Sequence, residues 1–408
     1  MLEAFARAGY EIVPFSQDAD VYLVNTCTVT GTGDQKSLKT IRRVAREHPS
    51  AAIVASGCLA QRDAQHLLGM DNVRLVLGVQ RRAEVVELLQ KALAENAQIN
   101  AVAPLRDAPF ETLFVTRHEG KTRATMKIQE GCDRYCAYCI IPSVRGPVRS
   151  MPLPAVRAEA LRLRDAGYRE IVVTGIHLAS YGRGTDDTLL DAIRAVHETG
   201  VRVRIGSLEP VVVTAAFAQA LSEMPNLMRQ FHLSLQSGAE TVLRRMRRRY
   251  TPDEYAGALE TLRRPMPDLA ATTDLIAGFP GETEQEHLET MAFVKQCAFA
   301  RIHVFPYSKR SGTPAAEMIN QVDEETKKQR TASLIQLGNK LEIDFVQSIT
   351  GTVQAVLFES RADKLCEGYT QHYVRVRANA EPGTVVHIQI ERTEGTTAYG
   401  APYEKGGR

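Results

Sequence analysis

Three closely spaced cysteines constrain this chain more than any other feature of its sequence. Cys132, Cys136 and Cys139 follow the pattern C-x3-C-x2-C, directly after the strand-like run 124–129. Three thiolates on one tight loop can hold three irons of a 4Fe–4S cube, which leaves the fourth iron open to another ligand. A structural zinc site would need a fourth Cys or His nearby, and His177 is the first candidate that follows. The spacing therefore favours an open-iron cluster over a zinc loop or three unrelated buried thiols.

Composition is that of an ordinary soluble protein with more than one domain. The 408 residues are 44% hydrophobic and 24% charged, and a chain of this length is expected to form two or three domains. No apolar run approaches ~18 residues, so we expect no membrane span. Residues 1–10 lack the basic segment and cleavage site of a secretion signal. We therefore predict a cytoplasmic protein, whose seven cysteines are metal ligands or buried thiols rather than disulfides.

Residues 1–98 alternate between helix-like and strand-like segments. This alternation predicts a parallel sheet with helical crossovers, as in a doubly wound α/β domain. The expected elements are a helix at 2–8, strands at 21–25 and 52–55, and a helix at 83–94. The looser stretch 96–108 contains Pro104 and is expected to be a linker. The first domain is therefore predicted to cover residues 1–105.

From residue 118 onward, strand and helix patterns alternate in a longer series. Six strands are expected, at 124–129, 170–174, 201–205, 231–235, 271–276 and 302–305. Repeated strand–helix units predict a (β/α)6 partial barrel that stays open on one side. The cysteine loop follows the first strand, so it is expected at the rim where barrel active sites lie. This second domain is predicted to cover residues 118–347.

The pattern changes after a long predicted helix at 324–346. Half-buried strands are expected at 351–358, 373–377 and 385–391. A short segment of this kind suits a small β-barrel, which is a common platform for RNA. Residues 348–408 are therefore predicted to form a third, RNA-binding domain.

A dense basic run lies in the middle of the chain. Its members are Arg244, Arg245, Arg247, Arg248 and Arg249. Such a run is either the solvated face of a helix or a contact for nucleic-acid phosphates.

The cysteine loop, the strand–helix series and the β tail together resemble the methylthiotransferase family of radical SAM enzymes, over nearly the whole chain. Several segments resemble the branch of that family that acts on threonylcarbamoyladenosine in tRNA. They are Asn-Thr-Cys-Thr-Val-Thr at 25–30, Thr-Gly-Ile-His-Leu at 174–178, Ser-Tyr-Gly at 180–182, Leu-Gln-Ser-Gly at 235–238, Gly-Phe-Pro-Gly-Glu-Thr at 278–283, His-Val-Phe-Pro-Tyr-Ser-Lys at 303–309 and Gly-Thr-Pro at 312–314.

The resemblance implies an enzyme that replaces an adenine ring C–H with a methylthio group, next to the anticodon. It implies two molecules of S-adenosyl-L-methionine, a 4Fe–4S radical SAM cluster and a second, auxiliary iron–sulfur cluster that carries the sulfur. The tail would be a TRAM-like domain. The expected partners are tRNA and a reducing electron donor such as flavodoxin or ferredoxin, and we expect a monomer.

Carried over residue by residue, the resemblance makes Cys132, Cys136 and Cys139 the ligands of the radical SAM cluster. The predicted contacts of the cofactor lie at strand ends, with Asp274 inside a strand. They are Gly175, Ser207, Glu209, Gln236, Asp274 and Gly278. Each polar member has the alternative of being an ordinary rim residue, and Gly175 of being a plain turn. Arg145 and Arg149 are expected either to bind a carboxylate or phosphate, or to lie at the surface.

Cys27 and Cys58 each follow a predicted strand, at 21–25 and 52–55. Neighbouring parallel strands would bring both to one rim, where the resemblance places ligands of the auxiliary cluster. Cys297 and Cys366 have no partner spacing and are expected to be buried thiols.

The chain departs from the family pattern at its start. The family's domain normally opens with a further strand and a Gly-Cys turn, whereas this sequence begins with the helix that follows them. Two auxiliary cysteines stand where the family has three, and two thiolates cannot occupy three irons of a cube. We expect that this sequence starts at a downstream methionine of a longer natural protein. The alternative is a protein that is truly shorter.

Two other functions fit parts of the pattern. One is a RimO-like protein methylthiotransferase, against which the His303–Lys309 segment and the basic run argue. The other is a tRNA-binding protein whose sulfur transfer is impaired by the incomplete auxiliary ligand set.

Overall fold

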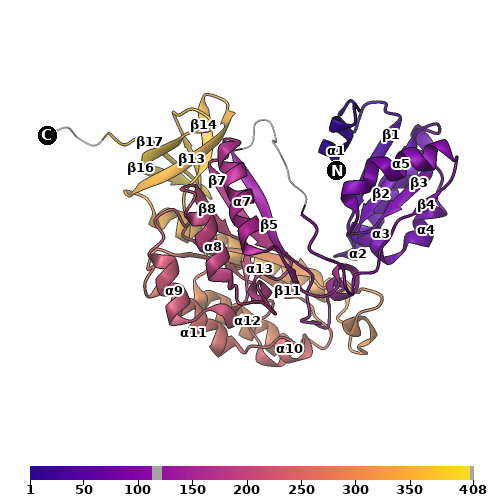
Figure 1. Cartoon of the computed structure of the whole chain (residues 1–408). Coiled ribbons are helices and arrows are strands. Elements are labelled where there is room, and N and C mark those ends of the chain that lie inside the picture. Colours follow the sequence, from indigo (N-terminus) through magenta and orange to yellow (C-terminus); the bar gives the residue numbers. More distant parts are fainter. Residues whose placement is uncertain (113–121, 405–408) are drawn as a thin grey trace. The chain divides into compact units, whose positions relative to one another are not determined.

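The computed structural model describes residues 1–112 and 122–404 (Figure 1). The chain divides into two compact units, each of which is described by itself. One comprises Met1–Thr116, Glu130–Arg149 and Ser308–Glu317, and the other Arg117–Gln129, Ser150–Tyr307 and Met318–Arg408. These units cross the predicted domain borders, which stay predictions. Within the described residues, no helix combines the length and apolar character needed to cross a membrane.

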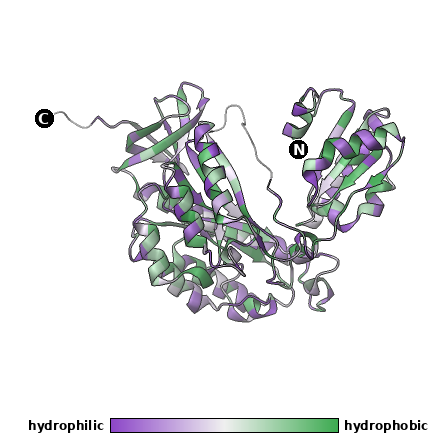
Figure 2. Cartoon of the chain, viewed as in Figure 1, coloured by the Kyte–Doolittle hydropathy of each residue, from purple (hydrophilic) through white to green (hydrophobic). Residues whose placement is uncertain are grey.

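The first unit contains a four-stranded parallel sheet in the order β1-β2-β3-β4. Its strands are β1 (Val21–Thr26), β2 (Ala52–Gly57), β3 (Val73–Leu77) and β4 (Ile99–Asn100), and they are mostly hydrophobic (Figure 2). Its helices are α1 (Leu2–Arg7), α2 (Gly31–Glu47), α3 (Cys58–Arg62), α4 (Ala64–Leu68), the 3-10 turn η1 (Arg82–Glu84) and α5 (Val85–Ala94). The predicted parallel α/β domain is confirmed, although β4 lies in the segment that we expected to be a linker.

Both faces of this sheet are buried, because alternate residues of a strand point to opposite faces. Ile53 and Ala55 of β2 pack in a cluster with Ile41 of α2. Ala52 and Val54 of the same strand pack in a second cluster with Leu89 of α5 (the continuous apolar run of β2 follows from this double burial). The first unit also contains α6 (Ile141–Arg145) and the 3-10 turn η4 (Pro314–Glu317).

The second unit is built on two four-stranded sheets, ordered β6-β5-β7-β8 and β12-β11-β10-β9. The strands are β5 (Arg123–Glu130), β6 (Arg149–Ser150), β7 (Glu170–Gly175), β8 (Arg202–Ile205), β9 (Ser207–Leu208), β10 (Gln230–Leu233), β11 (Ala270–Ala277) and β12 (Arg301–Pro306). All six predicted strands are therefore present. The third corresponds to β8, and the short strand β9, which follows after Gly206 and belongs to the other sheet, was not predicted.

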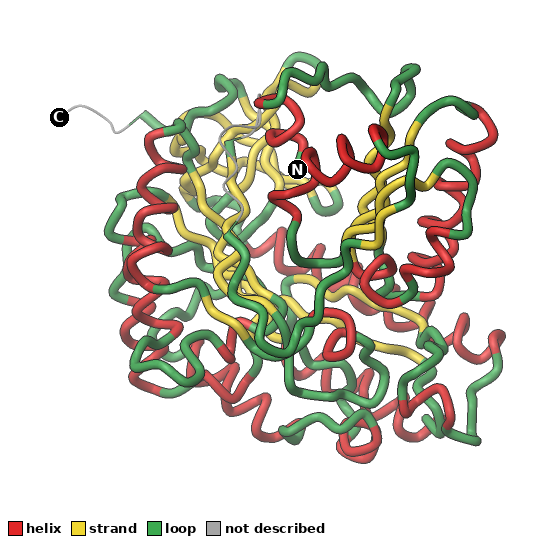
Figure 3. Tube along the Cα trace, turned by 45° about the vertical axis from the view of Figure 1, so that its right-hand side comes forward, coloured by secondary structure: helices red, strands yellow, loops and turns green. Residues whose placement is uncertain are grey.

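Helices lie along the outer side of these strands (Figure 3). They are α7 (Leu153–Asp165), α8 (Leu189–His197), the 3-10 turns η2 (Leu178–Ser180) and η3 (Pro210–Val212), α9 (Ala215–Ser222), α10 (Glu240–Arg245), α11 (Pro252–Arg263), α12 (Glu284–Cys297) and α13 (Glu324–Ser348). Thr188, Thr251 and Thr283 begin three of the helices with reciprocal capping boxes. Each box satisfies two backbone groups that a helix start otherwise leaves unpaired.

The C-terminal segment is a closed five-stranded barrel in the order β13-β14-β15-β17-β16. Its strands are β13 (Val353–Ala362), β14 (Leu365–Tyr369), β15 (Arg375–Ala378), β16 (Val385–Glu394) and β17 (Thr397–Pro402). Phe358, Val376 and Ile390 are fully buried in its core. The predicted small β-barrel is confirmed, and the sequence pattern missed β14 and β17.

A buried charge network fixes this barrel to the rest of the second unit. Arg123 donates to Glu359 of β13 over 2.7 Å, and its guanidinium lies 4.9 Å from the ring centre of Tyr373. Arg204 donates to the carbonyl of Thr370 over 3.4 Å. Both arginines also lie near Glu170, whose side chain is 1% exposed.

Candidate functional site

The loop that carries Cys132, Cys136 and Cys139 is closed on itself in the first unit. The Cys132 N–H donates to the carbonyl of Gly146 over 3.1 Å, and the Cys139 N–H donates to that of Cys136 over 3.0 Å. Gly131 has φ +75°, and a Cβ on it would lie 1.9 Å from the Pro147 carbonyl oxygen. Only glycine therefore allows this return of the chain.

The donor set of this loop fits an iron–sulfur cluster. It offers three thiols and no imidazole, and Asp133 is its single carboxylate, so soft thiolate ligands outnumber the oxygen ligands that a hard cation prefers. Cys136 is buried, whereas Cys132 and Cys139 are half-buried. Within the described parts of the chain, no three Cys, His, Asp or Glu side chains converge on a point suited to a single metal ion. A cube binds each thiolate at a separate iron, so its ligands need no such convergence.

Cys27 and Cys58 lie at the same edge of the parallel sheet, as predicted. The register pairs Thr26 with Gly57, the residues that directly precede the two cysteines. Gly57 has φ +102°, and a Cβ on it would lie 2.4 Å from the Thr26 carbonyl oxygen. The two strand ends are thus close, and the thiol of Cys27 is one of the groups that raise the pKa of Cys58.

Burial is the largest cause of the raised pKa of the Cys58 thiol, and the guanidinium of Arg145 opposes it. Arg145 Nε lies 3.0 Å from Cys58 Sγ, and its Nη1 lies 3.2 Å from Glu130 Oε1. Glu130 directly precedes the cysteine loop and Arg145 ends α6, which follows it. One guanidinium therefore connects Cys58 to both ends of the loop that carries the other three cysteines.

The surface alternative is wrong for Arg149, which is buried, whereas Arg145 is half-buried. Arg149 is buried and donates to the carbonyl of Arg145 over 2.8 Å and to that of Leu105 over 3.3 Å. The side chain of Arg145 is 21% exposed and is engaged by Glu130. The position of Arg149 in the sequence gave no sign of its contact with Leu105, because Leu105 comes from a distant segment.

The predicted cofactor contacts all lie in the second unit, at or near the carboxyl ends of strands. Gly175 ends β7, and a Cβ on it would lie 2.8 Å from Gln129 Cβ. The Gln129 side chain in turn accepts from the backbone N–H of His177 over 2.6 Å. Ser207 is exposed in β9. Close packing against Gln129 therefore explains the need for glycine at position 175. The contact of Gly175 with a cofactor stays a prediction.

Glu209 lies in a buried ion-pair cluster. Its Oε2 is 2.9 Å from His177 Nε2, and its Oε1 is 2.9 Å from Arg248 Nη2. The His177 Nδ1 lies 2.6 Å from the Ser180 hydroxyl. Two residues from separate predicted motifs, His177 and Glu209, thus meet next to an arginine of the basic run.

Gln236 and Gly278 both have the left-handed backbone. Gln236 has φ +73°, and its backbone bridges β11 by donating to the carbonyl of Asp274 and accepting from the N–H of Ile276. Gly278 has φ +70°, and a Cβ on it would lie 2.1 Å from Lys327 Cγ.

Asp274 has a side-chain partner that sequence reasoning did not find. Its Oδ2 lies 3.3 Å from His232 Nε2.

The basic run is divided between the interior and the surface. Arg245 pairs with Glu286 over 2.8 Å, and Arg248 pairs with Glu209. Arg244, Arg247 and Arg249 are exposed. The run is therefore neither a uniform solvated face nor a uniform phosphate-binding surface.

The other two cysteines are buried, as predicted. Cys297 is 4% exposed and Cys366 1% exposed. Burial raises the pKa of the Cys297 thiol to about 12. A thiol with this pKa is protonated near neutral pH and therefore a poor metal ligand.

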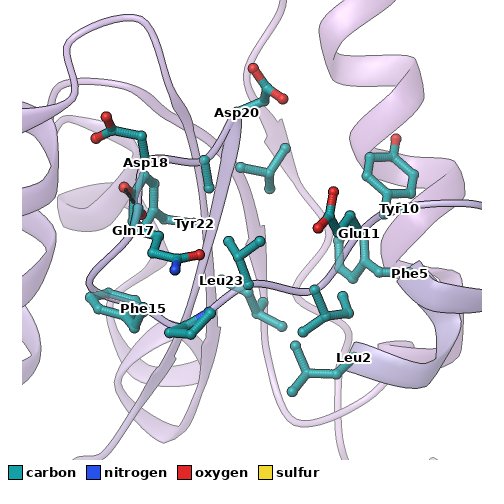
Figure 4. Close-up of a pocket in the computed structure, with 15 residues that line it drawn as sticks. Leu2, Phe5, Tyr10, Glu11, Phe15, Gln17, Asp18, Asp20, Tyr22 and Leu23 are labelled. Carbon is teal, nitrogen blue, oxygen red and sulfur yellow. Dashed lines mark hydrogen bonds between the residues drawn. The ribbon is translucent and has the colours of Figure 1, made fainter.

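A cavity of about 480 Å³ lies along β1 in the first unit (Figure 4). Its lining includes Leu2, Phe5, Phe15 and Tyr22 and contains no cysteine or histidine. The cysteine-bearing edge of the sheet is therefore a separate feature.

Comparisons with known proteins agree with this arrangement. Residues 126–294 match the Radical SAM superfamily, and residues 1–78 match the uncharacterized protein family UPF0004. A solved radical S-adenosylmethionine methyltransferase, TsrM from Kitasatospora setae, is 13% identical with a TM-score of 0.55, over 74% of this chain and 66% of that chain. This likeness shows the fold.

Curated relatives match nearly the whole chain. Threonylcarbamoyladenosine tRNA methylthiotransferase MtaB of Bacillus subtilis (strain 168) is 39% identical over 99% of this chain and 91% of its own. A tRNA-2-methylthio-N(6)-dimethylallyladenosine synthase of Akkermansia muciniphila is 33% identical over 98% of this chain and 94% of its own. The chain therefore belongs to the radical SAM methylthiotransferase family, in its MtaB-type branch.

Proposed function

We propose that this chain is a tRNA-modifying enzyme that converts N6-threonylcarbamoyladenosine, next to the anticodon, to its 2-methylthio derivative. The observation that carries the proposal is the closed loop of Cys132, Cys136 and Cys139 after β5, the first strand of the two sheets β6-β5-β7-β8 and β12-β11-β10-β9, which we call the half-barrel. The match to MtaB of Bacillus subtilis over nearly the full chain supports it. Because tRNA is the proposed substrate, we propose that the enzyme acts in the cytoplasm.

Membership of the radical SAM family implies a 4Fe–4S cluster and S-adenosylmethionine, which supply one-electron chemistry strong enough to remove hydrogen from an unactivated C–H bond. Cys132, Cys136 and Cys139 would hold this cluster. The backbone around Gly131 keeps their loop closed, and the Glu209 cluster keeps the ends of β7 and β9 in a fixed arrangement. Rigid supports of this kind preserve the alignment of the reacting groups that this one-electron chemistry needs.

Cys27 and Cys58 would supply ligands to a second, auxiliary cluster that carries the sulfur. Two observations support this part of the proposal. The residues that precede them are paired in the sheet, and Arg145 places a hydrogen-bond donor 3.0 Å from Cys58 Sγ. Two thiolates hold two irons at most, so the remaining irons of the cluster would need other ligands.

We further propose that the β-barrel binds tRNA and that the enzyme acts as a monomer supplied by a low-potential donor such as flavodoxin or ferredoxin. Arg392 is exposed, and its guanidinium lies 4.0 Å from the ring centre of Tyr399. An arginine stacked on an aromatic ring offers both a phosphate contact and a surface for a base.

The cluster assignment is tested by iron, sulfide and Mössbauer measurements on anaerobically reconstituted protein. The triple variant Cys132→Ala/Cys136→Ala/Cys139→Ala and the double variant Cys27→Ala/Cys58→Ala are compared with the wild type. Two clusters would give about eight irons, and each variant would lose only its own share. Cys366→Ala is a matched control, because it removes a buried thiol from the β-barrel.

The activity is tested by incubating each protein with tRNA that carries threonylcarbamoyladenosine and analysing the nucleosides by mass spectrometry. A 2-methylthio product with the wild type, lost in both cysteine variants, supports the proposal. SAM cleavage without that product from a protein with about four irons would restrict the activity to the radical half reaction. Methylthiolation of a ribosomal protein instead of tRNA would favour the RimO-like alternative.

The role of the β-barrel is better tested by surface substitution than by removing the tail. Deletion from residue 348 would uncover Arg123 and Arg204 and take away their partners in the barrel, Glu359 and Thr370. Arg392→Glu changes only an exposed side chain. We expect weaker tRNA binding in a filter assay with unchanged SAM cleavage, and equal binding would contradict the role.

A further inference from the structure

One face of the sheet β12-β11-β10-β9 is accessible and carries a group of polar side chains. Along β10 and the second half of β11, half-buried residues alternate with buried ones. The buried set includes Phe231, Leu233 and Leu275, which are fully enclosed. The accessible set includes His232 and Asp274, so one face is packed and the other is open to contacts.

Three titratable side chains meet on this accessible face. The register pairs His303 of β12 with Asp274 of β11, and it pairs His232 of β10 with Thr272 of β11. Paired residues of parallel strands point to the same face. The imidazole centres of His232 and His303 are 6.2 Å apart, so a single small group can contact both rings.

Asp274 and Thr272 hold His232 in place. His232 Nδ1 lies 3.1 Å from the Thr272 hydroxyl, and Nε2 lies 3.3 Å from Asp274 Oδ2. That second contact has ion-pair distance but not hydrogen-bond geometry, and Nε2 has no hydrogen-bond partner among the described residues although it is buried. A buried imidazole nitrogen without a hydrogen-bond partner costs free energy.

His303 is exposed and stands beside this pair. The ring is still partly enclosed by its neighbours, and this partial burial is the largest of the causes that lower its pKa. The ring is therefore neutral near pH 7, where it offers one hydrogen-bond donor and one acceptor. The part of the face around His232, Asp274 and His303 suits a polar group that both donates and accepts, whereas the next register pair on the same face, Ile276 and Phe305, is apolar.

The relatives of this chain are named for two modified adenosines, and the N6 groups of these adenosines differ in polarity. A threonylcarbamoyl group carries a urea, a hydroxyl and a carboxylate, whereas a dimethylallyl group is hydrocarbon only. A site built to hydrogen-bond a substrate rejects an analogue that lacks the matching groups, because its own polar atoms stay unpaired.

We propose that His232 and His303, with Asp274 as the positioning residue of His232, bind the polar N6 group of the modified adenosine and select it over a prenyl group. This inference rests on the proposed function, since it assigns residues to the substrate of that reaction. It assigns the two imidazoles to substrate selection and leaves the chemistry at the adenine ring to the cofactor.

The test compares the wild type with His303→Leu and His303→Asn in reconstituted holoenzyme. Fluorescence anisotropy measures the Kd of two anticodon stem-loops that differ only in the N6 group, threonylcarbamoyl or dimethylallyl. Product formation gives KM and kcat for each. We expect His303→Leu to weaken the binding of the threonylcarbamoyl RNA, because one hydrogen bond is lost. Its Kd and KM should rise about tenfold, and kcat should change less.

The dimethylallyl RNA should bind His303→Leu as well as or better than it binds the wild type, and His303→Asn should recover part of the selectivity. His66→Leu is the control, because His66 is exposed in α4. Equal losses for both RNAs, or no change in their Kd ratio, would overturn the inference and leave the proposed function standing. A wild type that modifies neither RNA would overturn both.

Discussion

The most direct test of the fold is the substitution Glu170→Gln in β7. This side chain is 1% exposed and accepts from Nε of Arg204 over 2.8 Å and from Nε of Arg202 over 3.1 Å. Arg123 lies 3.9 Å away. Glutamine keeps the shape of the side chain but removes the charge that balances three arginines.

The expected cost follows from these contacts. A hydrogen bond to a charged group contributes about 1.5–3 kcal/mol, and glutamine retains one acceptor oxygen, so part of one bond survives. Removing one member of a buried ion pair costs about 3–5 kcal/mol, because its partners stay buried and unbalanced. We therefore expect the free energy of unfolding of the second unit to fall by about 3–5 kcal/mol.

Native-state hydrogen exchange is the suitable assay, because a chain of two units need not unfold in one step. Amides of β7, β8 and the β-barrel should exchange faster in the variant. Urea unfolding followed by circular dichroism gives the matching shift in midpoint. Glu381→Gln is the control, since its ion pair with Arg361 is exposed and such pairs contribute little. Wild-type exchange in Glu170→Gln would refute this account of the network.

Three further predictions follow from the same structure. The folded-state pKa of Glu170 is lowered. The ionised side chain therefore contributes to the free energy of unfolding at pH values above the unfolded pKa of about 4.3. That contribution is lost as pH falls through the folded value, and the stability difference from Glu170→Gln, measured on metal-free protein, should shrink in acid. Tyr255→Phe should cost about 1 kcal/mol in urea unfolding, because it removes a 2.9 Å hydrogen bond to the Leu233 carbonyl, and a neutral result would contradict this. Gly131→Ala should reduce bound iron by disrupting the cysteine loop, whereas the control Gly167→Ala, with φ +92° and open space around it, should load iron normally.

Sequence reasoning was most successful where burial leaves a local signature. The strands of the half-barrel are short apolar runs, and β2 is buried at every residue, so periodicity and length were enough to find them. The meeting of Cys27 and Cys58 followed from the geometry of parallel strand ends. β14 and β17 were missed because each is short and half-buried, with Gly368 and Gly400 in their interiors.

Partners from distant segments were beyond the reach of the sequence. Glu209 was predicted as a cofactor contact, and the structure surrounds it with His177 and Arg248, which come from two other strand–helix units. Arg145 was expected at a ligand or at the surface, and it is bonded to Cys58, which precedes it by 87 positions. Such pairings depend on tertiary packing, which no local pattern records.

The docking of the β-barrel has a consequence for how this family can be recombined. Tyr373 of the tail lies against Arg123 and Arg204 of the half-barrel, at 4.9 and 4.7 Å from the ring centre. A tail exchanged between relatives would carry its ring but leave both arginines behind. Chimeras joined at residue 348 are therefore expected to fold only where the recipient supplies cationic side chains that match the ring of the incoming tail.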